Sequence, residues 1–368
     1  MPSAEQLDNL RGVLVDPVSD VVLPFPAGDP PAASRACEAA RLAEPLSGVE
    51  DDAEDPTVVA IATTGSTGAP RVVLLSRSAL QASIRATEER LGGPGHWLLC
   101  LGVDHIAGLQ VVLRAAAART GLGVIAPGGP GFAEAFAGVG HEPGRRYVSL
   151  VPTQLRRLLA DEAATAALAG YDAVLVGGAA SDPTLLARAR SASVRVVTSY
   201  GMTETCGGCV YDGRALAPVE VSVDGAGVIS LAGPMVARGY RGGPAFGGRV
   251  ETSDVGRFVD GRLEVLGRVD DVVVTAGHNV APTEVEAAIR AVPGVRDAAV
   301  FGLPDPERGR IVAALVVGEV GEERIRSALA VTLAAHARPR LLVRVEEIPR
   351  RGIGKLDRAE AERLLRRV

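Results

Sequence analysis

The sequence predicts an α/β fold in two parts, a large N-terminal layered α/β domain with a β-rich subregion and a small C-terminal α+β domain. Three observations predict it. From Thr57 onward, short apolar runs alternate with helical segments; after Gly213, strand pairs are joined by Asp-Gly turns; beyond Asp270, helices and strands alternate again. A length of 368 residues suits about two domains.

The large domain reads as strands alternating with helices, which favours a parallel sheet. Strands are expected at residues 58–62, 72–75, 147–150, 173–176 and 194–197. Ser76 or Ser78 can cap a helix that reaches about Leu91, residues 153–159 suit a second helix, and Pro183 suits the first position of a third. Loops after the carboxyl ends of parallel strands are common ligand sites.

The β-rich part contains two expected hairpins, and the small domain follows it. The hairpins pair residues 219–223 with 228–231 and residues 257–259 with 263–266. In the small domain, helices are expected at 284–291, 322–335 and the C-terminus, with strands at 298–301, 311–317 and 341–345. The boundary is placed at residues 269–271, so that the large domain covers 1–269 and the small domain 270–368.

Composition excludes several classes of protein. With 47% hydrophobic and 23% charged residues the chain is globular, and a net charge of -5 gives no nucleic-acid footprint. No secretory leader and no apolar stretch of about 18–20 residues is present, so no membrane is expected and a cytoplasmic protein is predicted. Cys206 and Cys209 form a CxxC pair without a second pair, for which packing is favoured over metal binding.

Residues 63–71, Thr-Thr-Gly-Ser-Thr-Gly-Ala-Pro-Arg, form the first segment with a chemical signature. Small hydroxyl and glycine residues let backbone N–H groups approach a polyphosphate, and Arg71 adds charge. The segment lacks the Gly-Lys-Ser/Thr ending of a Walker A loop. Taken alone, it could equally be an ordinary turn.

Residues 199–204, Ser-Tyr-Gly-Met-Thr-Glu, are expected directly after a strand. The Tyr200 ring can stack on a nucleobase, the Thr203 hydroxyl can meet a phosphate, and Glu204 can bind Mg²⁺ beside phosphates. The alternative is a strand-to-loop junction with a buried tyrosine.

A third segment comprises Thr252-Ser253-Asp254 together with residues 267–271, Gly-Arg-Val-Asp-Asp. A carboxylate that accepts hydrogen bonds from two vicinal hydroxyls is a usual way to hold a ribose, which suits Asp254 with Arg268 beside it. A charged surface hairpin is the alternative.

The fourth segment contains Lys355, the one lysine among 39 basic residues, in Gly-Ile-Gly-Lys-Leu-Asp. An ammonium group on a slim stem can enter a narrow pocket as a point charge, which a guanidinium does differently. Chance survival of a surface lysine is the alternative.

In this order and at these distances, the four segments resemble the adenylate-forming superfamily of acyl-CoA synthetases, luciferases and nonribosomal adenylation domains. The resemblance covers about residues 57–358. It implies ATP, Mg²⁺ and coenzyme A as cofactor and co-substrates, a small-molecule carboxylic acid as substrate, and a mobile small domain. A homodimer is one assembly that the sequence leaves open.

The resemblance assigns roles residue by residue. Lys355, Thr203 and Glu204 would be catalytic, with Glu204 also the metal ligand, and Asp270 would be the hinge. The residues implied to bind nucleotide or coenzyme A are Thr63, Thr64, Gly65, Ser66, Thr67, Gly68, Arg71, Gly178, Tyr200, Gly201, Asp254, Arg268 and Gly277. The residues implied to line the acid pocket are His105, Thr153, Gly177 and Met202. His105 precedes an apolar run and could instead be structural.

Within the superfamily, the chain resembles the o-succinylbenzoate–CoA ligases of menaquinone biosynthesis. The local matches are residues 104–109, 149–155, 176–180 and 200–213. Three departures stand out: Arg71 replaces a usual lysine, and Val72 and Ser253 replace usual glycines. The implied activity is AMP-forming acid–thiol ligation. Two alternatives remain open: an acyl-activating enzyme with another acid or a carrier-protein acceptor, and a nucleotide-binding protein without turnover.

Overall fold

The computed structural model describes residues 2, 4–14, 46, 50–64, 70–140, 143–351 and 355–365. By their contacts the residues group into two compact units. The first comprises Met1–Ser181, Leu185–Ser222 and Ser230–Glu251, and the second Asp182–Thr184, Val223–Ile229 and Thr252–Val368. The predicted boundary at residues 269–271 separates two parts that would rotate relative to each other. Units defined by contacts do not test such a boundary, so it stays a prediction.

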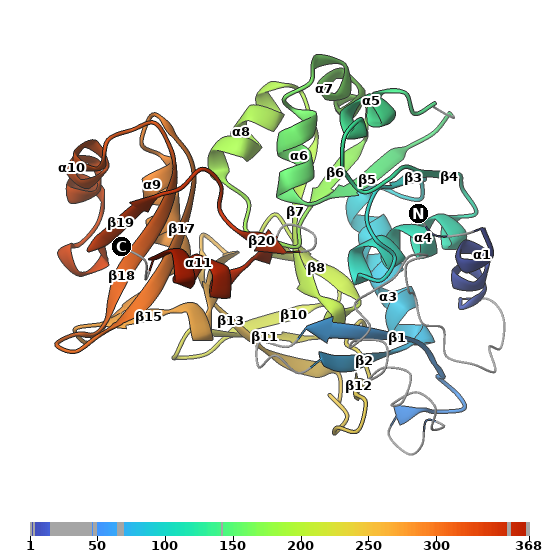
Figure 1. Ribbon diagram of the computed structural model, residues 1–368. Helices are drawn as coiled ribbons and strands as arrows, with labels where there is room; N and C mark the ends of the chain where they lie inside the picture. Colours follow the sequence, from blue (N-terminus) through green and yellow to red (C-terminus); the bar gives the residue numbers. More distant parts are fainter. Residues whose placement is uncertain are drawn as a thin grey trace. The chain divides into compact units, whose positions relative to one another are not determined.

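The helices lie in both units (Figure 1). They are α1 (Ala4–Gly12), α3 (Arg77–Leu91), α4 (Ile106–Ala118), α5 (Phe132–Ala137), α6 (Pro152–Leu158), α7 (Glu162–Ala169), α8 (Pro183–Ser191), α9 (Pro282–Arg290), α10 (Glu322–Thr332) and α11 (Arg358–Leu365), with the 3₁₀ turns η2 (Thr203–Thr205), η3 (Val269–Asp271) and η4 (Ala335–Ala337). None of the helices in the described ranges combines the length and apolarity that crossing a bilayer requires.

The strands are grouped in six sheets within the described residues. They are β1 (Thr57–Thr64), β2 (Pro70–Ser76), β3 (His96–Leu99), β4 (Leu122–Val124), β5 (Arg146–Leu150), β6 (Ala173–Val176), β7 (Val196–Met202), β8 (Gly207–Tyr211), β9 (Arg214–Ala215), β10 (Glu220–Val223), β11 (Val228–Ala232), β12 (Gly239–Tyr240), β13 (Arg249–Val259), β14 (Arg262–Arg268), β15 (Val273–Thr275), β16 (His278–Val280), β17 (Val295–Asp305), β18 (Gly309–Gly318), β19 (Leu341–Arg344), β20 (Arg350–Arg351) and β21 (Lys355–Leu356).

The main sheet of the first unit has seven strands in the order β4-β3-β5-β6-β7-β8-β9. β4, β3, β5, β6 and β7 are parallel, the orientation expected for this sheet, whereas β8 and β9 are antiparallel additions. The strands β3, β4, β8 and β9 were not predicted from the sequence. The predicted α/β class is confirmed. The expectation of an all-parallel sheet is wrong at the edge formed by β8 and β9, because the short turn η2 after β7 reverses the chain and makes β8 antiparallel to β7.

Both faces of this sheet are buried, because alternate side chains along each strand pack on opposite layers. Tyr147 and Leu175 face α3 and α4, whereas Val148 and Val174 face α5, α6, α7 and α8. These two layers of helices flank the sheet in Figure 1. Strands buried on both faces read as continuous apolar runs, which explains why β5 and β6 were recognisable from sequence.

The start of α3 follows the expected capping chemistry. The Ser76 hydroxyl accepts a hydrogen bond from the Ala79 N–H at 3.3 Å, and Gly92 ends the helix with φ 90°. The prediction that Ser76 or Ser78 caps this helix is therefore confirmed for Ser76.

β1 and β2 do not join the main sheet, which corrects the expectation that the early strands belong to it. They form an antiparallel hairpin, in which Thr63 lies opposite Arg71, and β12 adds to β2 through Tyr240 opposite Val73. Two strands joined by a short Gly/Ser/Thr segment pair more readily with each other than with a distant parallel strand.

The two Asp-Gly hairpins are confirmed. β10 pairs with β11 and β13 with β14, in a four-stranded sheet of order β10-β11-β13-β14. At the second turn, Asp260 and Gly261 have φ of 50° and 69°, the positive values that a two-residue hairpin turn needs.

The second unit also contains a three-stranded sheet, β17-β18-β19, with helices on both faces, and the two-stranded sheets β15-β16 and β20-β21. Val300 and Val316 pack with α9 and α10, whereas Phe301 and Leu315 pack with α11. The expected helices and strands of the small domain are all present, although α10 ends at Thr332 and a separate 3₁₀ turn follows it.

Candidate active site

Three neighbouring parallel strands of the first unit end beside the residues that the sequence selects. Thr153 follows β5 at the start of α6, Gly177 and Gly178 follow β6, and Tyr200 lies near the end of β7. Because the carboxyl ends of parallel strands meet at one edge, these residues lie along the same edge of the sheet.

The segment Ser199–Glu204 was expected directly after a strand, but its first four residues lie within that strand. Residues 199–202 continue β7 and pair antiparallel with β8, with a bulge between Tyr200 and Gly201. Thr203 and Glu204 then lie in the 3₁₀ turn η2, closed by Cys206 at φ 50°. The partner strand β8 carries two glycines and gave no strand signal in the sequence.

Two predicted ligand-binding glycines are required by the backbone itself. A Cβ atom at Gly201, where φ is 159°, would lie 2.1 Å from the Gly207 carbonyl oxygen, and one at Gly177 would lie 2.7 Å from the Ser199 oxygen. Both are far inside normal contact. These glycines allow β6, β7 and β8 to approach closely, whatever else they contact.

Glu204 is the most constrained of the selected residues. It is 9% exposed, and its Oε1 accepts a 2.7 Å hydrogen bond from the Tyr240 hydroxyl. Within the described part of the chain this is the one hydrogen bond of the carboxylate. Burial raises the pKa of Tyr240 to about 12, the Glu204 hydrogen bond and charge act in the same direction, and Arg71 opposes them.

Tyr240 was missed by the sequence reasoning. It lies 36 residues beyond Glu204, in a Gly- and Pro-rich stretch that carries no helix or strand period. Its place depends on the pairing of β12 with β2, a contact between distant segments that no local pattern reports.

The phosphate-loop prediction lies mostly outside the described residues. The predicted residues outside the described ranges are Gly65, Ser66, Thr67 and Gly68. For Thr64 the structure describes only the backbone. The Thr63 hydroxyl donates a 3.3 Å hydrogen bond to the Arg71 carbonyl oxygen. The exposed Arg71 guanidinium lies 4.5 Å from the centroid of the Tyr240 ring.

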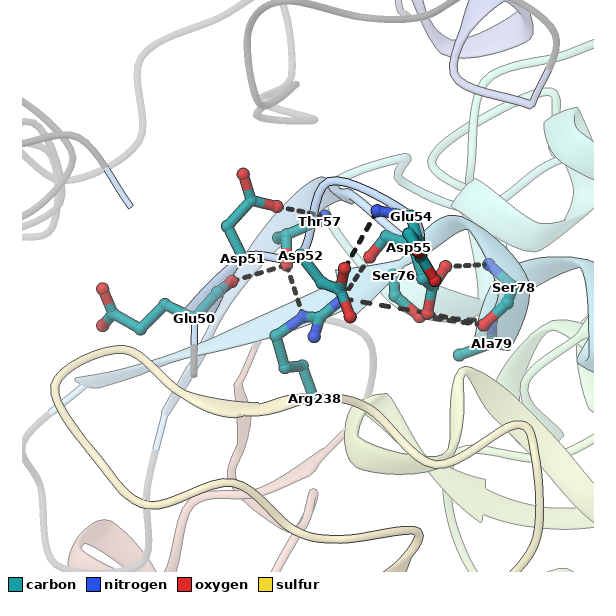
Figure 2. Close-up of polar contacts among 10 residues, drawn as sticks. All are labelled: Glu50, Asp51, Asp52, Glu54, Asp55, Thr57, Ser76, Ser78, Ala79 and Arg238. Carbon is teal, nitrogen blue, oxygen red and sulfur yellow. Dashed lines mark hydrogen bonds and ion pairs between the residues drawn. The ribbon is translucent and has the colours of Figure 1, made fainter. Parts of the chain in front are cut away.

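The segment that carries Tyr240 is anchored by Arg238, which Figure 2 shows between Thr57 and Asp55. Arg238 Nε donates to the Thr57 hydroxyl at 3.0 Å, and its Nη2 donates to the Asp55 carbonyl oxygen. Burial alone would raise the pKa of Asp55. Hydrogen bonds from Ser78 and Ser76 and the Arg238 charge outweigh that effect and hold the pKa below its ordinary value.

His105 and Met202 are the remaining acid-pocket candidates. His105 precedes α4 as its N-cap without a capping bond, and its Nε2 lies 3.7 Å from an Asp104 oxygen. Its side chain is 46% exposed, so it does not serve as a core residue. Met202 ends β7 next to Thr203 and is half-buried.

In the second unit, Asp254 and Arg268 lie opposite each other on β13 and β14. Arg268 Nη1 is 3.8 Å from Asp254 Oδ1, and Arg268 Nη2 is 3.7 Å from Asp270 Oδ2. One guanidinium therefore links the predicted ribose carboxylate to the predicted hinge residue. Ser253 is exposed, whereas Thr252 before it is buried and Asp254 after it is half-buried.

Gly277 and Lys355 both belong to hairpins of the second unit. Ala276 and Gly277, with φ of 49° and 79°, form the turn between β15 and β16. Among the described residues, apart from its two chain neighbours, no atom lies within 4 Å of a Cβ placed at Gly277. Lys355 begins β21, and its backbone pairs with Arg351 of β20. Residues 352–354, between the two strands, lie outside the described residues.

The CxxC pair packs in the interior, in line with the preferred interpretation. Cys206 and Cys209 are 0% and 2% exposed. Burial raises the pKa of the Cys209 thiol to about 12 and that of Cys206 further still. No cluster of three or more His, Cys, Asp and Glu side chains with metal-binding geometry occurs among the described residues.

A carboxylate at a turn after a parallel strand, near the hairpin of β1 and β2, suits a nucleotide-dependent enzyme of the adenylate-forming class. Comparison with known families agrees. Residues 2–241 match the AMP-binding enzyme family and residues 284–355 match the AMP-binding enzyme C-terminal domain. The chain belongs to the AMP-binding enzyme family.

Individual relatives narrow this class. A probable 2-succinylbenzoate–CoA ligase of Mycobacterium tuberculosis H37Rv is 44% identical over 334 residues, covering 84% of this chain and 85% of the relative. An o-succinylbenzoate coenzyme A synthetase from Bacillus subtilis, solved with ATP and magnesium, has a TM-score of 0.73 at 24% identity, covering 84% of this chain and 70% of that one.

A second solved structure has a different acceptor chemistry. An amide bond synthetase from Marinactinospora thermotolerans has a TM-score of 0.73 at 26% identity, covering 83% of this chain and 69% of that one. The predicted two-part α/β architecture is thereby confirmed.

Proposed function

We propose that this chain is an ATP-dependent, AMP-forming ligase that activates 2-succinylbenzoate and transfers it to coenzyme A. The observation that carries the proposal is the 44% identity to the M. tuberculosis ligase over 84% of this chain. The arrangement around Glu204 supports it, because that site suits ATP with a divalent cation.

Glu204 has the chemistry that Mg²⁺ requires. Mg²⁺ is typically held by one or two carboxylates together with substrate phosphates, and Glu204 has one carboxylate oxygen bound by Tyr240 and the other left for a cation. When bound, Mg²⁺ would neutralise phosphate charge. Thr203, adjacent to Glu204 in η2, would donate its hydroxyl hydrogen bond to the α-phosphate.

In the first half-reaction, a carboxylate oxygen of the acid attacks the α-phosphorus of ATP. An O–P bond forms, the bond to the β-phosphate oxygen breaks, and pyrophosphate leaves. The Lys355 ammonium would stabilise the charge that develops between acid and nucleotide, a preorganised electrostatic effect. Tyr200 would stack on adenine, and Asp254 with Arg268 would hold the ribose.

In the second half-reaction, the thiolate of coenzyme A attacks the acyl carbon, and AMP leaves with the electron pair of the acyl C–O bond. A rotation about Asp270 would withdraw Lys355 and present Gly277. Two observations support a hinge there: Asp270 is exposed in η3, and the two family matches leave residues 242–283 between them. The thiol substrate and a homodimer stay predictions.

Exchange of ³²P-pyrophosphate into ATP with a panel of aromatic carboxylic acids tests the proposal. We expect exchange with 2-succinylbenzoate and, after addition of coenzyme A, release of AMP and formation of a thioester. Exchange with another acid but not with 2-succinylbenzoate would indicate an acyl-activating enzyme of different specificity. An adduct with an amine but none with coenzyme A would favour the chemistry of the amide bond synthetase, and no exchange would favour nucleotide binding without turnover.

A further inference from the structure

Three side chains from three elements form a chain of contacts in the first unit. Arg71 from β2 lies over the ring of Tyr240 from β12, and Tyr240 donates its hydroxyl hydrogen to Glu204 in η2. We propose that Tyr240 is a positioning residue that orients the Glu204 carboxylate for its divalent cation, and that Arg71 acts through Tyr240 by fixing its ring. This inference rests on the proposed function in one respect, the assignment of Glu204 as the metal ligand.

The backbone is held by hydrogen bonds both before and after Tyr240 in the chain. Tyr240 pairs with Val73 of β2, and the Arg241 N–H donates to the Val72 carbonyl oxygen at 2.9 Å. Just before it, the Ala237 N–H donates to the carbonyl oxygen of Glu204 itself at 2.8 Å. One short segment therefore holds Glu204 by its main chain and by its side chain.

Arg238 connects that segment to the start of β1. Its hydrogen bonds to Thr57 and Asp55 (Figure 2) leave it little freedom, with 15% of the side chain exposed. Because Arg238 and Tyr240 are two residues apart, this anchor limits how far the tyrosine hydroxyl can move relative to Glu204.

The ring of Tyr240 is held by contacts on its face and at its edge. The Arg71 guanidinium carbon lies 4.5 Å from the ring centroid, and the Phe246 ring meets it in a T-shaped contact at 5.0 Å and 87°. A planar guanidinium can lie flat on an aromatic face, whereas an ammonium acts as a point charge. Arg71 is therefore suited to hold the ring, beyond any charge it offers to phosphate.

The direction of the Tyr240–Glu204 hydrogen bond follows from the two groups that form it. The phenol O–H is a donor and a carboxylate oxygen only accepts, so Tyr240 donates to Glu204 Oε1. The carboxylate then has one oxygen restrained at 2.7 Å. Hydrogen bonds that orient a metal-binding carboxylate typically affect metal affinity by about 10–100-fold.

The test measures metal binding directly, without the carboxylic acid. Binding of Mn²⁺, a paramagnetic substitute for Mg²⁺, is followed by the loss of the free-Mn²⁺ electron paramagnetic resonance signal in the presence of a non-hydrolysable ATP analogue. Tyr240→Phe keeps the ring and removes the hydroxyl. Arg71→Lys keeps the charge and removes the flat stack. The matched control is Tyr147→Phe, which removes a hydroxyl bound to the Leu91 and Gly93 carbonyl oxygens at 3.1 and 2.9 Å.

We expect Tyr240→Phe to weaken Mn²⁺ binding about tenfold, Arg71→Lys to weaken it about threefold, and Tyr147→Phe to leave it unchanged. In the Tyr240→Phe background, Arg71→Lys should weaken it less than it does alone, because the hydrogen bond through which it acts is gone. The Mg²⁺ concentration for half-maximal pyrophosphate exchange should shift in parallel, with the rate at saturating Mg²⁺ much less affected.

Two results would overturn the inference. One is unchanged Mn²⁺ affinity in Tyr240→Phe together with a loss of melting temperature like that of Tyr147→Phe, which would mark a packing role. The other is an unchanged Mn²⁺ affinity in Glu204→Gln, which would show that Glu204 does not bind the cation. If instead the wild type fails to exchange pyrophosphate with 2-succinylbenzoate while the Mn²⁺ defect of Tyr240→Phe persists, the proposed substrate is wrong and the positioning role stands.

Discussion

The two units hold their proposed nucleotide residues in opposite ways. In the first unit, Glu204 is 9% exposed and is fixed by main-chain and side-chain hydrogen bonds from one segment. In the second unit, the side chains of Arg268 and Asp270 are 41% and 61% exposed on a hairpin and a 3₁₀ turn. With the roles proposed above, the metal-binding residue is packed, whereas the hinge residue, which has to change conformation between two half-reactions, is exposed.

The largest expected effect comes from the second unit. Replacing Lys355 with Ala should lower acyl-adenylate formation by about 100–1,000-fold, because a preorganised charge at the developing transition state is lost. Release of thioester from a supplied acyl adenylate and coenzyme A should stay near the wild-type rate. Stopped assays of each half-reaction measure the two steps separately, and an equal fall in both would remove the proposed role of Lys355.

A pair of glycine substitutions compares the two regions directly. Gly201→Ala places a Cβ 2.1 Å from a carbonyl oxygen, so it should cost about 3 kcal/mol or more in unfolding free energy. Gly277→Ala adds a Cβ in open space at φ 79°, so it should cost about 1 kcal/mol while slowing thioester formation. Urea unfolding of both variants measures the two losses in unfolding free energy. A larger loss for Gly277→Ala than for Gly201→Ala would contradict this comparison.

Alkaline pH should weaken the packed site through Tyr240. Because the pKa of Tyr240 is raised to about 12 from an ordinary value of 10, the folded state favours the protonated phenol. This stabilisation is complete below pH 10 and is lost as the pH rises toward 12. The difference in unfolding free energy between wild type and Tyr240→Phe should therefore shrink between pH 8 and pH 11. A constant difference would contradict the burial of the hydroxyl.

The smallest effect concerns the buried thiols. Burial raises the pKa of the Cys100 and Cys209 thiols to about 12, so a thiol reagent at pH 8 should modify Cys100, Cys206 and Cys209 only after unfolding. Mass spectrometry of labelled peptides, with and without urea, reports each site. Fast native labelling of Cys206 or Cys209 would show that the turn after β7 opens readily.

The sequence was most informative where local chemistry decides the structure. β5 and β6 were recognisable as apolar runs, Ser76 as a cap, and Asp260-Gly261 as a hairpin turn, because each signal lies within a few residues. It failed where distant segments meet. Strand β8 was missed because glycines replace apolar residues in it, and β1 and β2 were expected in the main sheet although they pair with each other.

The candidate site shows the same division. Glu204 was found because its residue type follows a strand in a suggestive order, and family resemblance supplied roles for Asp254 and Lys355. Tyr240 was missed because its relation to Glu204 depends on β12 joining β2 across the fold. Most of the phosphate loop, residues 65–69, lies outside the described residues, so its predicted contacts stay predictions.

Arg238 and Arg241 have a practical consequence for any shortened form of this protein. Their carboxylate partners, Asp55 and Glu50, precede the first strand of the glycine-rich hairpin. A fragment that starts beyond Asp55 would remove these two carboxylates from the guanidinium groups on either side of Tyr240 in the sequence. Trimming the chain just before its first strand would thus remove contacts that hold the segment of Tyr240, the residue proposed to position Glu204 some 150 residues downstream of the cut.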